Sequence, residues 1–148
     1  MKAVRIHQYG NSEVLKYEDA PMPEITSTDV LVRVVAASVN PVDWKIREGY
    51  LKEMITYPMP LTLGWDVSGV IEAVGADVTR FKVGDAVFSR PDIKRNGTYA
   101  EYVAIRADEV ALKPKTISLA AEPLPRRRIP APTRAIRTTR QAWGFSTT

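Results

Sequence analysis

The alternation of apolar and polar residues predicts short β-strands along most of the first 114 residues. KAVRIHQY alternates as a half-buried strand does, and DVLVRVVAASV is a long β-branched run. The other stretches that predict strands are VLKYEDA, LTLGWDVSGVIEAVG, DAVFSR, TYAEYVAI and EVALKP. Helical periodicity is confined to residues 42–48, where Pro41 suits the first turn of a short helix. This pattern predicts a mainly β fold, either a barrel or a sandwich.

Glycine and aspartate separate the predicted strands, in YGNS, VGADV, VGDAV and RNGTY. Asn96-Gly97 lies between apolar segments and is the strongest short hairpin signal, although a loop fits equally well. The glycines of GWDVSGVIEAVGADV and KVGDAV permit turns and close strand approach, and they do not form a phosphate loop.

The character of the sequence changes after Lys115. From Pro123 to Thr148 there are four Pro, six Arg and five Thr, with no Lys and no acidic residue. Such a segment buries too little apolar surface to offset its ordering entropy, so we expect residues 120–148 to be disordered or weakly structured. The whole chain has a net charge of +4, but residues 1–122 hold 15 Lys and Arg against 17 Asp and Glu. The basic character therefore belongs to the tail.

Length and composition narrow the class of protein. A chain of 148 residues is enough for one ordinary domain. It contains no apolar run of about eighteen residues, so the sequence predicts no membrane span, and its first residues lack the apolar core of a secretory signal. The absence of Cys excludes disulfides and thiolate metal sites and is consistent with a reducing cytoplasm.

Residues 1–119 resemble the catalytic, GroES-like domain of the medium-chain dehydrogenase/reductase superfamily. The resemblance is carried by MKAVRIHQYG, VLKYEDAPMPEI, DVLVRVVAASVNPVDWKIREG, PLTLGWDVSGVIEAVGADVTRFKVGDAVFS and GTYAEYVAIRADEVALKPKTIS, in the family's order and spacing. It is closest to the zinc-free quinone oxidoreductases that use NADPH. The resemblance implies a GroES-like, partly open β-barrel with a short helix.

The resemblance also implies a domain without zinc. In zinc-dependent relatives the position of Asn40 is a Cys ligand, and the pair at Trp65-Asp66 is His-Glu. Zinc is usually held by four thiolate, imidazole or carboxylate donors. Asp43 and Asp66 alone do not supply these, and His7 is remote in sequence. We expect no bound metal.

A site without a Lewis acid suits substrates that are already good hydride acceptors, such as quinones and α,β-unsaturated carbonyls. Modest hydrogen-bond donors can stabilise the charge that develops on the substrate oxygen. Asn40 and Lys45 are the candidate donors, and Tyr50 is a candidate proton source or a wall of the site. The resemblance places Asn40 near the nicotinamide end of the cofactor, with Asp43 beside it.

Simpler roles exist for the same residues. Asp43 can serve only to cap or brace the short helix, and Lys45 can belong to a solvated face. Trp65 and Asp66 stand at the position of the His-Glu pair and are candidates for substrate contact, but a Trp more often fills a core. Tyr57, Tyr99 and His7 are interpreted as packing or structural residues.

Members of the family continue into a Rossmann domain that holds NADPH through a glycine-rich turn. No GxGxxG motif and no βαβ pattern follows residue 115. We interpret the chain as a substrate-side domain, inactive by itself, whose residues 120–148 are an out-of-frame reading or a natural Arg-rich arm. Two alternatives remain open: a GroES-like binding or assembly module without catalysis, and a protein that associates with nucleic acid through its basic tail.

Overall fold

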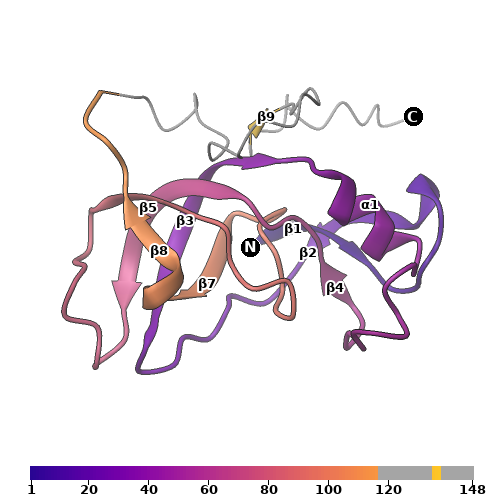
Figure 1. Ribbon diagram of the computed structural model, residues 1–148, viewed down its shortest axis with the longest axis horizontal. Helices are drawn as coiled ribbons and strands as arrows, with labels where there is room; N and C mark the ends of the chain where they lie inside the picture. Colours follow the sequence, from indigo (N-terminus) through magenta and orange to yellow (C-terminus); the bar gives the residue numbers. More distant parts are fainter. Residues whose placement is uncertain (117–134, 138–148) are drawn as a thin grey trace.

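The computed structural model describes residues 1–116 and 135–137, which form curled antiparallel sheets and one short α-helix (Figure 1). The strands among these residues are β1 (Lys2–Ile6), β2 (Leu15–Asp19), β3 (Asp29–Ser38), β4 (Leu61–Thr62), β5 (Val67–Val74), β6 (Ala86–Ser89), β7 (Tyr102–Arg106), β8 (Val110–Leu112) and β9 (Ala135–Arg137). The helix α1 spans Pro41–Arg47, and the 3-10 turns η1 and η2 span Ser12–Val14 and Ala107–Glu109. The mainly β architecture and the short helix after Asn40 confirm the sequence prediction.

The strands form two sheets. The first has the order β2-β1-β4, and the second has the order β7-β3-β5-β6-β8. All these pairings are antiparallel, and β3 has β5 along one edge and β7 along part of the other. Two irregularities in the β3–β5 register, at Leu31/Val32 and Val34/Ala36, bend this pair. The larger sheet therefore curls into a half-barrel rather than lying flat.

The segment 99–101 joins the two sheets. Ala3 in β1 forms a bridge with Ala100, and the Val4 N–H donates to the Tyr99 carbonyl at 2.7 Å. On the other side of the bridge the Glu101 N–H donates to the Lys2 carbonyl at 3.0 Å. Residue 99, which matters for the site below, is thus fixed by backbone bonds to β1.

The core lies inside the curl and is made of β-branched and aromatic side chains. Its fully buried members include Val30, Val32, Ile71, Ile105 and Trp65. On β3 the apolar side chains at alternate positions face this core, as the period-2 pattern of the sequence predicts.

The structure divides the long apolar stretch 61–75, which the pattern alone presents as one strand. β4 ends at Thr62, and β5 begins only at Val67. Between them Gly64 has φ +88°, a conformation that a strand residue does not adopt. The backbone of this break pairs instead with the loop that contains Asn96-Gly97, through Thr98 N to Gly64 O at 2.8 Å and Tyr99 N to Leu63 O at 2.9 Å. Asn96-Gly97 therefore belongs to a loop and not to a hairpin turn.

The prediction of disorder for residues 120–148 lies outside the described residues, apart from β9. The backbone of β9 pairs with Ala36–Ser38, on the edge of β3 that β7 leaves uncovered.

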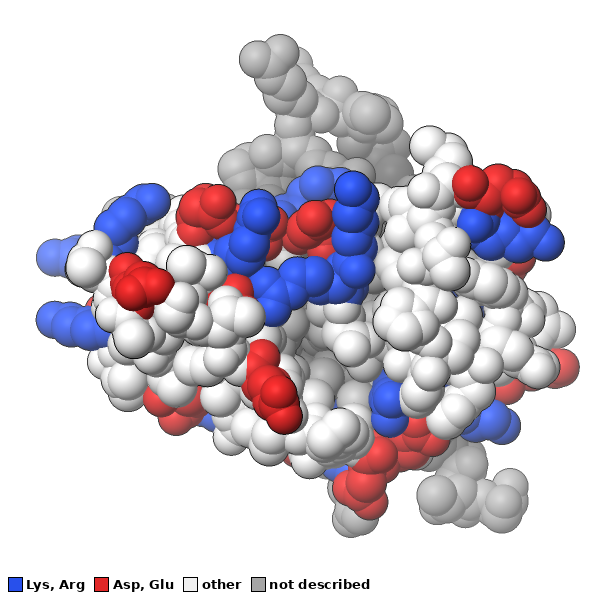
Figure 2. Space-filling model, turned by 90° about the horizontal axis from the view of Figure 1, so that it is seen from below, with Lys and Arg blue, Asp and Glu red and all other residues white. Residues whose placement is uncertain are grey.

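Charged side chains of both signs lie on the surface of the described part of the chain (Figure 2). On the face seen in Figure 2, Lys and Arg lie beside Asp and Glu. Among the described residues, ion pairs such as Arg33–Glu72, with a separation of 2.6 Å, bring opposite charges together. Across residues 1–116 and 135–137, no helix has the length and apolarity needed to cross a bilayer.

Candidate active site

The candidate site is built where β3 ends and α1 begins. Asn40 has an extended backbone and is the N-cap of α1, and Pro41 takes the first helical position, where its missing N–H is not needed. The carboxylate of Asp43, in the first turn, accepts the Asn40 backbone N–H at 2.6 Å. An acidic side chain at this position also interacts favourably with the helix dipole. Asp43 thus braces the helix, as one of the two sequence interpretations proposed.

The side chain of Asn40 points to Asp66, the residue just before β5. Its Nδ2 donates to the Oδ2 of Asp66 at 2.6 Å, and both residues are only 4% exposed. An ionised carboxylate can only accept, so the NH₂ end of the amide faces Asp66. This end carries two protons, and the bond to Asp66 uses one. Asn40 and Asp66, two of the site residues predicted from the sequence, are therefore bonded directly to each other.

A second contact reaches the site from the 95–101 segment. The hydroxyl of Tyr99 lies 2.8 Å from Asp43 Oδ2 and 3.3 Å from the Ser38 carbonyl oxygen. Burial, and then the negative charge of Asp43, raise the pKa of Tyr99 far above its usual value. Thr98 adds a hydrogen bond from its Oγ1 to the Asp66 carbonyl, at 3.0 Å. Asn40, Asp43 and Asp66 consequently lie in one buried polar cluster.

Trp65 lies next to Asp66 in the chain but faces the core. It is 1% exposed, its Nε1 donates to the Arg95 carbonyl at 3.2 Å, and its ring lies 6.3 Å from that of Tyr57. This placement supports the core-filling role that the sequence left open beside substrate contact.

Lys45 and Tyr50 lie outside the buried cluster. Lys45 is exposed on α1, with its Nζ 5.8 Å from the centre of the Trp44 ring. Tyr50 is 64% exposed and packs edge-on against Trp44, with ring centres 5.6 Å apart. The contacts of both side chains are thus with Trp44 on the surface of the helix, and their predicted roles stay predictions.

A comparison with protein families decides what kind of domain this is. Residues 26–115 match the family model of the alcohol dehydrogenase GroES-like domain. The chain belongs to this family. The match covers β3 to β8 and includes every predicted site residue.

Similar proteins are longer than this GroES-like chain. It is 42% identical over 129 residues to 2-methylene-furan-3-one reductase of Solanum lycopersicum, a match that covers 81% of the chain and 32% of that protein. It is 42% identical over 127 residues to a chloroplastic NADPH-dependent alkenal/one oxidoreductase of Arabidopsis thaliana, covering 81% and 33%. Among solved structures, the quinone oxidoreductase of Coxiella burnetii superimposes with a TM-score of 0.73 at 36% identity, covering 80% of this chain and 38% of that one. The chain thus spans about a third of the length of these curated relatives.

The donors available in this GroES-like domain do not fit zinc. The chain has no Cys and one His, and the His7 Nε2 lies 2.8 Å from Glu18, between β1 and β2. Within the described ranges, no three or more His, Cys, Asp or Glu side chains gather as a metal site would require. At the positions that the family resemblance assigns to zinc donors, the structure has the Asn40 amide and the buried Trp65 indole. The expectation that the protein holds no zinc stays a prediction.

A surface pocket of about 230 Å³ lies away from this cluster. Arg5, Thr62, Asn96 and Tyr102 are among its lining residues, and none of the predicted site residues lines it.

Sequence reasoning missed the contribution of the 95–101 segment. From the sequence, Tyr99 is interpreted as a packing residue, and nothing singles out Ser38 or Thr98. Their contacts join positions far apart in the chain, such as Asp43 and Tyr99, which are 56 positions apart. The only signal in the sequence is the presence of polar residues at the ends of buried strands.

Proposed function

We propose that this GroES-like domain is the substrate-side part of an NADPH-dependent oxidoreductase that reduces quinones or α,β-unsaturated carbonyl compounds by hydride transfer. The observation that carries the proposal is the Asn40–Asp66 bond at the end of β3 and start of β5. It supports the proposal because Asn40, a polar donor, stands at the position that the family resemblance assigns to a Cys ligand in zinc-dependent relatives. The names of the similar proteins, which include reductases of a furanone, of alkenals and enones and of quinones, support the same substrate class.

Hydride transfer needs a hydrogen-bond donor to the substrate oxygen that becomes negative when hydride adds to the conjugated system. NADPH supplies the hydride when bound. The second N–H of Asn40 is the donor that we assign to that oxygen, because the bond to Asp66 fixes the amide plane and leaves this proton unused. Lys45 and Tyr50, exposed on the surface formed by α1 and the turn that follows it, are proposed to supply a second donor and the proton.

The described residues do not fit the nucleotide part of NADPH. Its pyrophosphate is usually held at the turn between a parallel strand and a helix N-terminus. Every pairing between the strands of residues 1–116 and 135–137 is antiparallel. We therefore propose that a separate dinucleotide-binding domain completes the enzyme, and that Asn40 and Asp43 lie near the nicotinamide in the complete enzyme.

The test compares two proteins. The first is the 148-residue chain, and the second is residues 1–118 followed in frame by the dinucleotide-binding domain of a relative. NADPH oxidation is measured with a simple quinone and with an α,β-unsaturated ketone. We expect turnover only from the second protein, because hydride transfer needs the nicotinamide held against the substrate. Turnover by the short chain would show that the cofactor site is misplaced, and no turnover by a folded joined protein would contradict the proposed function.

A further inference from the structure

Asn40 is held in place through one oxygen of Asp43. That oxygen, Oδ2, accepts the Asn40 backbone N–H at 2.6 Å and also lies 2.8 Å from the Tyr99 hydroxyl. The backbone N–H can only donate, so Oδ2 acts as an acceptor. The phenol has one proton, and Asp43 offers a shorter contact than the Ser38 carbonyl at 3.3 Å. The Tyr99 hydroxyl therefore donates its hydrogen bond to Asp43.

The Tyr99 ring has little freedom to move away from this bond. Its residue is 6% exposed, and its backbone bonds to Leu63 on one side and to Val4 on the other. A side chain at Gly64 would collide with the Tyr99 ring, so the absence of a Cβ there makes room for the ring. The hydroxyl thus presents a fixed donor to Asp43 from an element separate from α1.

We propose that Tyr99 is a positioning residue for Asn40, acting through Asp43. By holding Asp43 Oδ2, Tyr99 fixes the N-cap of α1, and this fixes the amide of Asn40 against Asp66. The consequence for catalysis rests on the proposed function of Asn40, whereas the consequence for the position of Asn40 does not. The raised pKa of Tyr99 means that its hydroxyl stays a donor at every ordinary pH.

Tyr57 provides a matched control. It is also 6% exposed and also belongs to the core cluster. Among the described residues its hydroxyl has no hydrogen-bond partner. Tyr57→Phe and Tyr99→Phe therefore remove the same atom from two equally buried rings, but only the second change removes a bond to the site.

The first experiment uses the 148-residue chain and measures amide hydrogen exchange and the ¹⁵N–¹H spectrum. We expect Tyr99→Phe to speed exchange of the Asn40 backbone N–H roughly tenfold relative to that of Ile71 in β5, the size expected for a lost bond to a charged acceptor. The side-chain NH₂ resonances of Asn40 should also move. Tyr57→Phe should leave both unchanged. A general loss of stability would speed exchange at Ile71 as well, so the ratio separates positioning from stability.

If Tyr99→Phe does not fold, Asp43→Asn replaces it, because loss of the charge weakens both bonds to Oδ2. It should change the Asn40 exchange ratio in the same direction. An unchanged Asn40 exchange ratio with unmoved NH₂ resonances, in whichever variant folds, would overturn the proposal.

The second experiment uses the joined enzyme described above. Tyr99→Phe should lower kcat about ten- to a hundredfold with little change in KM, because a displaced donor is lost chiefly in the transition state. Tyr57→Phe should leave both parameters unchanged. An inactive joined wild-type enzyme would refute the proposed function, while the exchange ratio would still decide the role of Tyr99. Unchanged kcat in an active Tyr99→Phe enzyme would overturn the catalytic consequence.

Discussion

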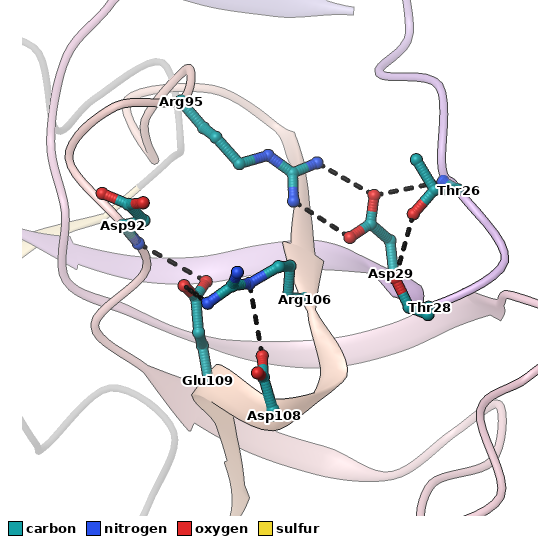
Figure 3. A network of polar contacts seen from close by, with 8 residues as sticks. All are labelled: Thr26, Thr28, Asp29, Asp92, Arg95, Arg106, Asp108 and Glu109. Carbon is teal, nitrogen blue, oxygen red and sulfur yellow. Dashed lines mark hydrogen bonds and ion pairs between the residues drawn. The ribbon is translucent and has the colours of Figure 1, made fainter.

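Asp29 at the start of β3 and Arg95 in the loop before β7 form a bidentate ion pair across 66 positions of the chain (Figure 3). Both guanidinium–carboxylate distances are 2.9 Å, and the Asp29 side chain is 1% exposed while that of Arg95 is 33% exposed. The Arg95 carbonyl accepts the Trp65 indole N–H, so the pair also fixes the loop beside the site. These contacts connect the stability of the sheet with the segment that carries Thr98 and Tyr99.

Arg95→Met should lower the free energy of unfolding by about 3 kcal/mol, because it leaves a buried carboxylate without its charged partner. Arg106→Met is the matched control. Arg106 is 52% exposed and pairs with Asp108 and Glu109, so its loss should change stability by less than about 1 kcal/mol. Urea denaturation at neutral pH measures both. Equal effects of the two changes would contradict the importance of the Asp29 pair.

The same pair predicts an acid dependence. The hydrogen bonds from Arg95 lower the pKa of Asp29 from 3.8 to about 2, against the opposing effect of burial. Because the pKa of Asp29 is lower in the folded chain than in the unfolded chain, its ionisation stabilises the fold fully at pH values above the unfolded-state pKa. This contribution is lost as the pH falls through the folded-state pKa. The chain should therefore lose stability between about pH 4 and pH 2. Arg95→Met should show a smaller loss over this window in denaturation curves, and an unchanged acid slope would contradict the assignment.

Gly64→Ala should destabilise the protein by at least about 3 kcal/mol, because a Cβ at Gly64 adds a collision with the Tyr99 ring to the strain of a positive φ. Gly84 has nearly the same backbone, φ +90° against +88°, but no atom outside its chain neighbours lies within 4 Å of the position that a Cβ would take. Gly84→Ala should therefore lose only about 1 kcal/mol. Thermal denaturation measures the stability that each variant loses, and the difference between the two losses isolates the contact with Tyr99. Equal losses would show that the Tyr99 ring moves aside without cost.

Tyr57→Phe should leave stability at neutral pH unchanged or raise it, because a buried hydroxyl without a described partner is lost. Burial, with smaller contributions from Tyr9 and Asp92, raises the pKa of Tyr57 from 10.0 to about 12. Because the pKa of Tyr57 is higher in the folded chain than in the unfolded chain, the chain keeps its full stability at pH values below the unfolded-state pKa. Stability is then lost as the pH rises from the unfolded-state pKa toward the folded-state pKa. The wild-type chain should thus lose more stability than Tyr57→Phe between about pH 10 and pH 12. Denaturation at alkaline pH checks this, and identical slopes would refute it.

The regular elements could be predicted from the sequence because their signals are local. Strand alternation and Pro41 predict β3 and α1, and the family resemblance, through a Cys position and a His-Glu pair, singles out Asn40 and Asp66. The break at Gly64 could not be predicted, because the backbone there forms hydrogen bonds with residues 97–99, which are distant in the chain. For the same reason Trp65 could be core or site until its contacts were known. The link from Tyr99 to Asp43 also depends on the way in which the sheets curl, and no short pattern encodes it.

Asn40 is proposed to act on the substrate without a metal. The most direct measurement is NADPH-dependent quinone reduction by the joined enzyme and its Asn40→Ala variant, after chelator treatment and elemental analysis for zinc. We predict activity without stoichiometric zinc in the unmodified enzyme, and a loss of kcat of about 10²-fold or more in the variant, the size expected for one donor to a developing oxyanion. The variant should still give the β-rich spectrum of a folded chain. Zinc that survives chelation, or full activity in Asn40→Ala, would contradict the account.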